Sequence, residues 1–197
     1  MDDKYLIIGL GNPGRQYRKN RHNTGFMLID RFAETIALSF SRLQGGALIA
    51  QGDYETKKVI LAKPQTFMNL SGKAALSLVK FYKMPLDNVI IIHDDLDLPL
   101  GTLRIRPDGG SGGQKGIHSV LVNLGTDQFP RIRMGIGRPP GNMEAPDYVL
   151  KNFNPGETPL VEDMLMRGVG ALREWIKYGL SSSMNIYNSK NQDNFLE

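Results

Sequence analysis

The sequence contains no cysteine and only three histidines among its 197 residues. Without cysteine there can be no disulfide, thiolate zinc site, iron–sulfur cluster or cysteine nucleophile, and a reducing compartment suits the chain. Long apolar runs are also absent, because no stretch approaches the roughly 18 apolar residues that a membrane-spanning helix needs. We therefore expect a cytoplasmic protein with no membrane segment.

The positive charge is concentrated in two segments. Residues 15–21 hold four basic residues and no acid, and residues 104–138 hold six basic residues against two acids. Residues 139–197 hold five basic residues and eight acids, so the net charge of +4 comes from upstream. This asymmetry favours a basic face suited to an acidic partner such as a nucleic acid. Charge alone leaves open the alternative of an ordinary solvated surface.

The apolar pattern predicts one α/β domain over residues 1–197. Strands are predicted at residues 5–10, 47–51, 59–62, 89–92, 103–106 and 131–136. Helices are predicted from about residues 25, 70 and 117, through 160–175, and after a serine cap at 181–183. The sequence has no internal repeat and no low-complexity linker. The expected fold is a single domain with a twisted, mixed, mostly parallel β-sheet flanked by helices.

Residues 9–14 (GLGNPG) match the G-x-G-x-x-G pattern of dinucleotide-binding proteins. That function needs a helix to begin within the glycines, so that its first N–H groups meet the pyrophosphate. Here the segment Asn12, Pro13 and Gly14 is typical of a turn, and helical spacing begins only near Gly25. The context argues against a nicotinamide cofactor.

Residues 109–113 (GGSGG) match the G-x-S-x-G pattern of serine hydrolases. In those enzymes an acid and then a histidine follow the serine along the chain, whereas the only histidine after Ser111 is His118, on the next predicted helix. We expect Ser111 to be a spacer in a glycine-rich loop, and keep a serine hydrolase as an alternative.

His22 is the favoured candidate for proton transfer near neutral pH. It lies in a polar loop after the first predicted strand, and Asp94 ends the apolar strand 89–92. The carboxyl ends of such strands border the ligand crevice of open α/β sheets. A carboxylate at one ring nitrogen would fix the tautomer of His22 and make a general base. A loop histidine with only local hydrogen bonds is the alternative, and His93 is expected to be structural.

Two further polar groups admit alternatives. His93, Asp94, Asp95 and Asp97 could suggest a metal site, but neighbouring strand residues point to opposite faces, and we expect no metal. Asn69 lies at a predicted helix start, where it could orient a carbonyl or a water, or serve simply as an N-cap.

Five spaced motifs together resemble those of bacterial-type peptidyl-tRNA hydrolases. They are residues 9–14 followed by Tyr17, 20–25 (NRHNTG), 66–72 (TFMNLSG), 93–99 (HDDLDLP) and 133–139 (RMGIGRP). The resemblance runs in order from residue 7 to about residue 190. It implies a monomeric α/β enzyme, without metal or cofactor, that cleaves the ester between a peptide and the 3′ end of tRNA.

The resemblance also implies roles for individual residues. His22 would be the catalytic base and Asp94 its partner, while Asn69 or a backbone N–H would steady the oxyanion. The expected contacts to the substrate are Asn12, Tyr17, Asn23, Phe67, Met68, Arg104, Arg106, Gly113, Lys115 and Arg133. Among these, Met68 would line the peptide site, and the arginines would meet the region of the tRNA 5′-phosphate.

The sequence departs from the family pattern in the glycine-rich loop. Where the family commonly has Gly-Gly-His-Asn-Gly, residues 112–116 are GGQKG. The family's asparagine helps to hold substrate, so its role does not transfer directly to Lys115, which is suited to contact phosphate. A non-catalytic RNA-binding module on the same fold is a further alternative.

Overall fold

Strand β1 (Lys4–Gly9) lies inside a seven-stranded sheet of order β2-β3-β4-β1-β5-β7-β6 in this computed structural model, which describes residues 4–189. The other strands are β2 (Arg42–Gln44), β3 (Ala47–Tyr54), β4 (Lys57–Pro64), β5 (Val89–Asp95), β6 (Leu103–Arg106) and β7 (Arg131–Gly135). Strands β4, β1, β5 and β7 run parallel, and antiparallel pairs complete both edges. The mixed α/β sheet is as expected; residues 1–3 and 190–197 of the predicted 1–197 domain lie outside the described residues.

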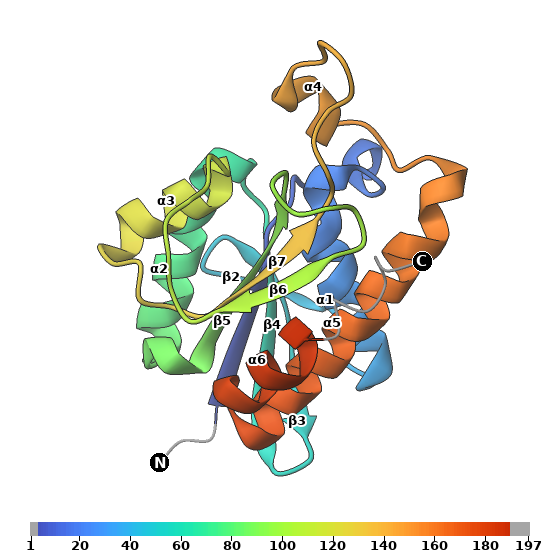
Figure 1. Ribbon diagram of the computed structural model, residues 1–197. Helices are drawn as coiled ribbons and strands as arrows, with labels where there is room; N and C mark the ends of the chain where they lie inside the picture. The colour runs from blue at the N-terminus through green and yellow to red at the C-terminus, as the bar shows by residue number, and fades with distance from the viewer. Residues whose placement is uncertain (1–3, 190–197) are drawn as a thin grey trace.

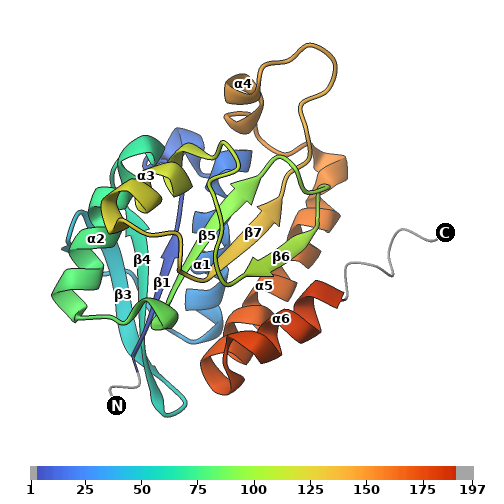
Figure 2. The same ribbon diagram turned by 60° about the vertical axis from the view of Figure 1, so that its left-hand side comes forward.

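Helices cover both faces of the sheet (Figure 1). One face carries α1 (Thr24–Thr35), α5 (Thr158–Tyr178) and α6 (Leu180–Ser189), and the other carries α2 (Ser71–Tyr82) and α3 (Lys115–Leu124). The short helix α4 (Ala145–Val149) projects beyond the carboxyl ends of β5 and β7 (Figure 2). Short 3₁₀ helices are η1 (Arg15–Tyr17), η2 (Arg21–Asn23), η3 (Met68–Leu70), η4 (Leu86–Asn88) and η5 (Pro155–Glu157). No helix within residues 4–189 combines the length and apolarity needed to cross a membrane.

The run of β-branched residues in β5 is buried on both faces, as its sequence predicted. Ile90 and Ile92 pack toward α1 and α5, whereas Val89 and Ile91 pack toward α2 and α3. Burial of each such side chain contributes about 1.5–3 kcal/mol to folding. The strand is thereby fixed between two apolar layers, which holds the polar residues at its carboxyl end in place.

Three details differ from the sequence predictions. The hairpin strands β3 and β4 pair over eight residues each, because main-chain pairing continues through their polar ends to Tyr54↔Lys57. Helix α3 begins at Lys115 because the Gln114 side chain caps it. The serine cap predicted at residues 181–183 was wrong: these serines lie within α6, and Gly179 (φ 89°) separates α5 from α6.

Glycines 9 and 25 allow helix α1 to approach the sheet closely. A Cβ atom on Gly9 would overlap the carbonyl oxygen of Gly25, and one on Gly25 would overlap the carbonyl oxygens of Leu10 and Ile92. The first glycine of the G-x-G-x-x-G match thus serves packing, and α1 starts only at Thr24. This contact brings the loop before α1 against the end of β5.

Candidate active site

The candidate site lies at the carboxyl ends of β1 and β5. Strand β1 pairs with β4 on one side and β5 on the other, and α1 and α2 lie on opposite faces, so this is the switch point where α/β sheets bind ligands. Helix η2 delivers His22 to this point and β5 delivers Asp94. The expected meeting of two residues 72 positions apart is therefore found.

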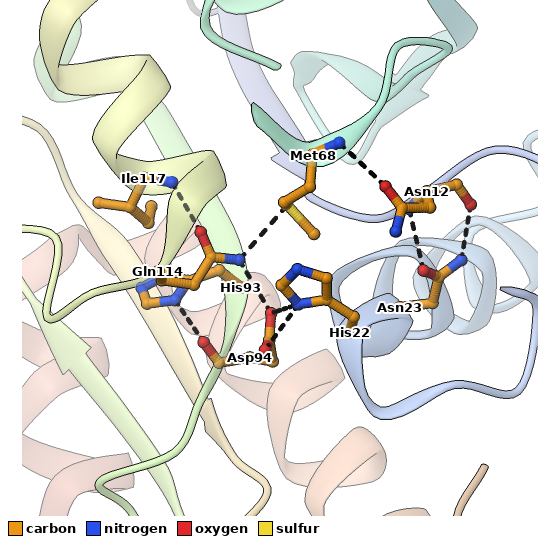
Figure 3. A network of polar contacts seen from close by, with 8 residues as sticks. All are labelled: Asn12, His22, Asn23, Met68, His93, Asp94, Gln114 and Ile117. Carbon is orange, nitrogen blue, oxygen red and sulfur yellow. Dashed lines mark hydrogen bonds and ion pairs between the residues drawn. The ribbon is translucent and has the colours of Figure 1, made fainter. Parts of the chain in front are cut away.

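His22 and Asp94 form a buried hydrogen-bonded pair (Figure 3). The Nδ1 atom of His22 is 2.8 Å from Oδ2 and 2.9 Å from Oδ1 of Asp94. Because a carboxylate accepts there, Nδ1 carries the hydrogen of the neutral ring and Nε2 holds the lone pair. Nε2 is turned toward Met68 and has no hydrogen-bond partner within residues 4–189. The ring is thus arranged to accept a proton from a ligand or water.

Asp94 is held as a carboxylate. Burial acts to raise the pKa of this carboxyl, but the attraction of His22 and hydrogen bonds from His22 and Gln114 outweigh it, so the pKa lies below its ordinary value. Asp94 is only 2% exposed. The carboxylate therefore stays charged beside His22 at neutral pH and stabilises a proton taken up by the ring.

Asn12, Asn23 and Met68 form a second hydrogen-bonded group beside His22 (Figure 3). The Asn23 side chain accepts from the Asn12 backbone N–H and donates to the Asn12 carbonyl, both at 2.9 Å. The Asn12 Oδ1 atom accepts from the Met68 backbone N–H at 2.9 Å. These bonds fix the Asn12 amide and leave its Nδ2 donor without a partner in the described chain.

The remaining predicted substrate residues near this end are more exposed. Asn69 is exposed and caps neither η3 nor α2, whose N-caps are Phe67 and Leu70, so the N-cap alternative fails. Phe67 is 60% exposed, and Tyr17 is half-buried in η1. Asn69, Phe67 and Tyr17 form no hydrogen bond to the side chain of His22 or Asp94.

Four arginines share the opposite face of β5, β7 and β6. The register pairs Arg133 with both His93 and Arg104, and Arg131 with Arg106, so these five side chains point to one side of the sheet. Arg133 forms an ion pair with Asp95 at 2.6 Å. Arg104, Arg106 and Arg131 have no ion-pair partner within the part of the chain that the structure describes.

A cavity of about 370 Å³ lies between this arginine face and the glycine-rich loop. It is lined by His93, Asp95, Arg106, Asp108, Gly109, Gly110, Ser111, Gly112, Arg131 and Arg133. Arg131 is only 2% exposed. Its guanidinium donates to the carbonyls of Gly110 and Asp127, and burial lowers its pKa. Only the buried Nε of this guanidinium has no partner among residues 4–189.

The side chain of His93 points into this cavity, on the opposite face of the sheet from the side chain of Asp94. Its Nδ1 donates to the Asp94 carbonyl at 2.7 Å, and its buried Nε2 has no partner in the described chain. Burial lowers the pKa of His93 in spite of the attraction of Asp94, so the ring is neutral. Within residues 4–189 no three histidine, aspartate or glutamate side chains gather as metal ligands.

The chain matches known proteins along most of its length. The family model described as peptidyl-tRNA hydrolase matches residues 6–194. The chain belongs to the peptidyl-tRNA hydrolase family. A relative from Chloroflexus aurantiacus is 46% identical over 93% of this chain and 98% of its own, and one from Desulforamulus reducens is 47% identical over 94% and 89%. Both are named peptidyl-tRNA hydrolase, and the chain is accordingly a hydrolase.

Solved structures agree on the fold. The Arg119Gln mutant of peptidyl-tRNA hydrolase from Acinetobacter baumannii superimposes with a TM-score of 0.90 at 29% identity, covering 96% of each chain. A 5′-methylthioadenosine nucleosidase from Arabidopsis thaliana, with a TM-score of 0.55 at 8% identity and coverage of 91% and 98%, shares the fold alone. The resemblance in the sequence motifs is confirmed at the level of the family.

The glycine-rich loop of this peptidyl-tRNA hydrolase family member does not form a serine nucleophile site. The Ser111 hydroxyl has no hydrogen bond to a histidine among the described residues, and His118 is exposed on α3. Gly113 (φ 81°) and Lys115 are also exposed at this end of α3. Neither residue is hydrogen-bonded to His22 or Asp94.

Two residues near the site were missed in the sequence. Gln114 donates from Nε2 to Oδ1 of Asp94 at 2.9 Å, and its position before α3 was the only signal. Arg21 is buried and pairs with Glu157 at 2.7 Å, with the rings of Tyr148 and Phe153 at 4.5 and 4.9 Å. The partners of Arg21 are more than 120 residues away, so no local pattern could reveal them.

Proposed function

We propose that this hydrolase cleaves the ester bond between a peptide, or an N-blocked aminoacyl group, and the 3′ end of tRNA. The observation that carries the proposal is the His22–Asp94 pair with a free Nε2 at the switch point of the sheet. Family membership supports the substrate class, since the relatives carry the name peptidyl-tRNA hydrolase.

In the proposed reaction, His22 Nε2 takes a proton from water as the water oxygen attacks the ester carbonyl carbon. Asp94 stabilises the imidazolium that forms. Asn69 or a backbone N–H donates to the oxyanion, and the fixed Asn12 amide orients the substrate. The carbonyl then re-forms, the ribose oxygen leaves, and the proton on His22 passes to it. The products are a free peptide and intact tRNA.

We propose that the arginine face holds phosphates of the tRNA. Arg104 and Arg106 offer guanidinium groups that have no ion-pair partner among residues 4–189, and these suit bidentate contacts to phosphate, with Arg133 beside them on β7. Lys115, Gly113 and Tyr17 lie on exposed or half-exposed segments that can extend the contact. Phosphate contacts carry no sequence information, so we expect different tRNAs to be accepted.

We also propose that the enzyme works as a monomer in the cytoplasm, without metal or cofactor. Every residue in the mechanism comes from one chain. Peptidyl-tRNA arises at ribosomes, and its ester is reactive enough for hydrolysis by an activated water. Asn23 holds Asn12 in position through their two hydrogen bonds. Met68 contacts the peptide part of the substrate.

The test is release of the N-acetyl-aminoacyl group from tRNA by the His22→Ala variant, measured beside wild type and the exposed-histidine control His118→Ala. We expect loss of release with retained tRNA binding for His22→Ala, and full activity for the control. Substantial activity of His22→Ala would overturn the proposal. A wild-type protein that binds tRNA without cleaving it would instead indicate the RNA-binding module, and labelling of Ser111 by a serine-directed phosphonate would indicate a serine hydrolase.

A further inference from the structure

Gln114 joins the amino terminus of helix α3 to the carboxylate of Asp94 (Figure 3). Its Oε1 accepts from the Ile117 backbone N–H at 2.7 Å, which caps the helix. Its Nε2 donates to Asp94 Oδ1 at 2.9 Å and lies 3.4 Å from the Met68 sulfur. Both ends of one amide are therefore used, and the orientation of the amide is fixed by the helix N–H.

We propose that Gln114 is a positioning residue for the reaction, which anchors Asp94 to α3 so that the carboxylate presents its oxygens to His22. The inference rests on the proposed function. It assigns a role to a residue at which this chain departs from the Gly-Gly-His-Asn-Gly pattern. Because an amide does not titrate, Gln114 supplies a donor over the whole pH range and takes no proton itself.

The surroundings of Asp94 explain why such an anchor is needed. The carboxylate is 2% exposed, and its side-chain partners in the described chain are His22 and Gln114. Since both oxygens lie at similar distances from His22 Nδ1, the histidine alone does not fix the rotation of the carboxylate. The Gln114 donor selects Oδ1 and removes this freedom. Preorganisation of this kind lowers the reorganisation needed in the transition state.

Gln114 also connects the two functional parts of the molecule. Its backbone N–H donates to the Ser111 carbonyl at 3.0 Å, within the loop that borders the arginine cavity. The guanidinium of Arg131 donates a hydrogen bond of 3.1 Å to the Gly110 carbonyl in the same loop. The residue that orients Asp94 is thus the last residue of the loop that faces the proposed phosphate site.

The variant Gln114→Glu keeps the cap of helix α3 but removes the hydrogen bond to Asp94. A glutamate oxygen can still accept from the Ile117 N–H, but a carboxylate cannot donate to Asp94. Two ionised carboxylates separated by about the 2.9 Å of the present contact repel each other, so the pair keeps a shared proton to a higher pH than either carboxyl group would alone. We expect kcat to approach the wild-type value at low pH and to fall as the pH rises and the shared proton is lost.

Gln114→Ala removes both contacts and serves as the second variant. We expect kcat to fall about tenfold with KM and tRNA affinity unchanged, because one charge-assisted hydrogen bond is lost away from the substrate. The acidic limb of its pH–rate profile should move to higher pH, since the Asp94 carboxylate loses a donor that favours its charged form. A residue with only a capping role would not move this limb.

The control is Gln51→Glu, which makes the same change of charge at an exposed position of strand β3. It should leave the pH–rate profile of peptidyl-tRNA hydrolysis unchanged. Wild-type kcat and wild-type pH dependence in both Gln114 variants would overturn the positioning role while leaving the proposed function intact. If wild type itself did not hydrolyse peptidyl-tRNA, the proposed function would fail first, so the two failures are distinguishable.

Discussion

Two adjacent residues at the end of β5 serve two differently built regions. Asp94 faces a group whose hydrogen bonds are satisfied inside the protein by His22 and Gln114. His93, the preceding residue, faces a cavity in which the guanidinium of Arg106 has no hydrogen-bond or ion-pair partner among residues 4–189. The first arrangement fixes geometry, as proton transfer requires. The second leaves donors available for an anion, which suits binding of phosphate.

Asp94→Asn tests the first region and carries the largest expected effect. An asparagine keeps the shape, but it cannot stabilise the imidazolium and its amide can turn a donor toward Nδ1 of His22. We expect kcat for peptidyl-tRNA to fall by about 10³- to 10⁴-fold, as for the corresponding change in a serine protease. Equilibrium binding of tRNA, measured in parallel, should be unchanged. A loss of binding with normal kcat would contradict the division into two regions.

Arg106→Ala tests the second region and should have the opposite signature. One unpaired guanidinium is removed from the cavity, so the slope of log K against log salt should become shallower by about one for tRNA binding. The kcat at saturating substrate should stay near wild type, and Arg104→Ala should behave in the same way. Arg42→Ala, on β2 at the opposite edge of the sheet, is the matched control. An unchanged slope for both variants would remove this face from the tRNA contact.

His93 should make stability depend on pH. Its pKa is lowered by burial, so below its ordinary value of 6.5 the unfolded chain binds a proton that the folded chain does not. The free energy of unfolding should therefore fall as the pH drops below about 6.5. In His93→Asn, whose amide can still donate to the Asp94 carbonyl, urea unfolding should lose this component. An identical pH dependence in wild type and variant would show that His93 is not buried neutral.

Asn188→Ala should have the smallest effect on the protein. It tests whether Asn188 stabilises the edge strand β6, which carries Arg104 and Arg106. The Asn188 side chain accepts from the Ile105 N–H at 2.8 Å and donates to the Ile105 carbonyl at 3.1 Å, so it occupies the open edge of β6. Its loss should cost about 1–2 kcal/mol of stability in urea unfolding. The exposed Asn185 on the same helix provides the control variant Asn185→Ala. Equal stability of the two variants would contradict this role.

Local patterns predicted the elements of the fold well. The buried run in β5 and the alternation in β6 and β7 identified these strands because burial of one or both faces leaves a direct trace in the sequence. The cap of α3 and the end of α5 were misjudged, since both depend on single residues, Gln114 and Gly179. The order of the strands in the sheet was not predicted from the sequence, because it depends on contacts between distant segments.

The candidate site was predicted where chemistry restricts the choice of residue. His22 and Asp94 could be proposed as partners because few side chains transfer protons near neutral pH and both follow strand ends. The burial of Arg131 and the contacts of Arg21 could not be foreseen. Both depend on loops and rings brought together from distant parts of the chain. Non-local packing of this kind leaves no periodic signal in the sequence.

The most direct test of the account is a double-mutant comparison of His22→Ala, Asp94→Asn and the combined variant in single-turnover hydrolysis of N-acetyl-aminoacyl-tRNA. Because Asp94 is proposed to act only through His22, the combined variant should be no slower than His22→Ala alone. Losses of rate that multiply in the combined variant would contradict the central claim that the two residues act as one base.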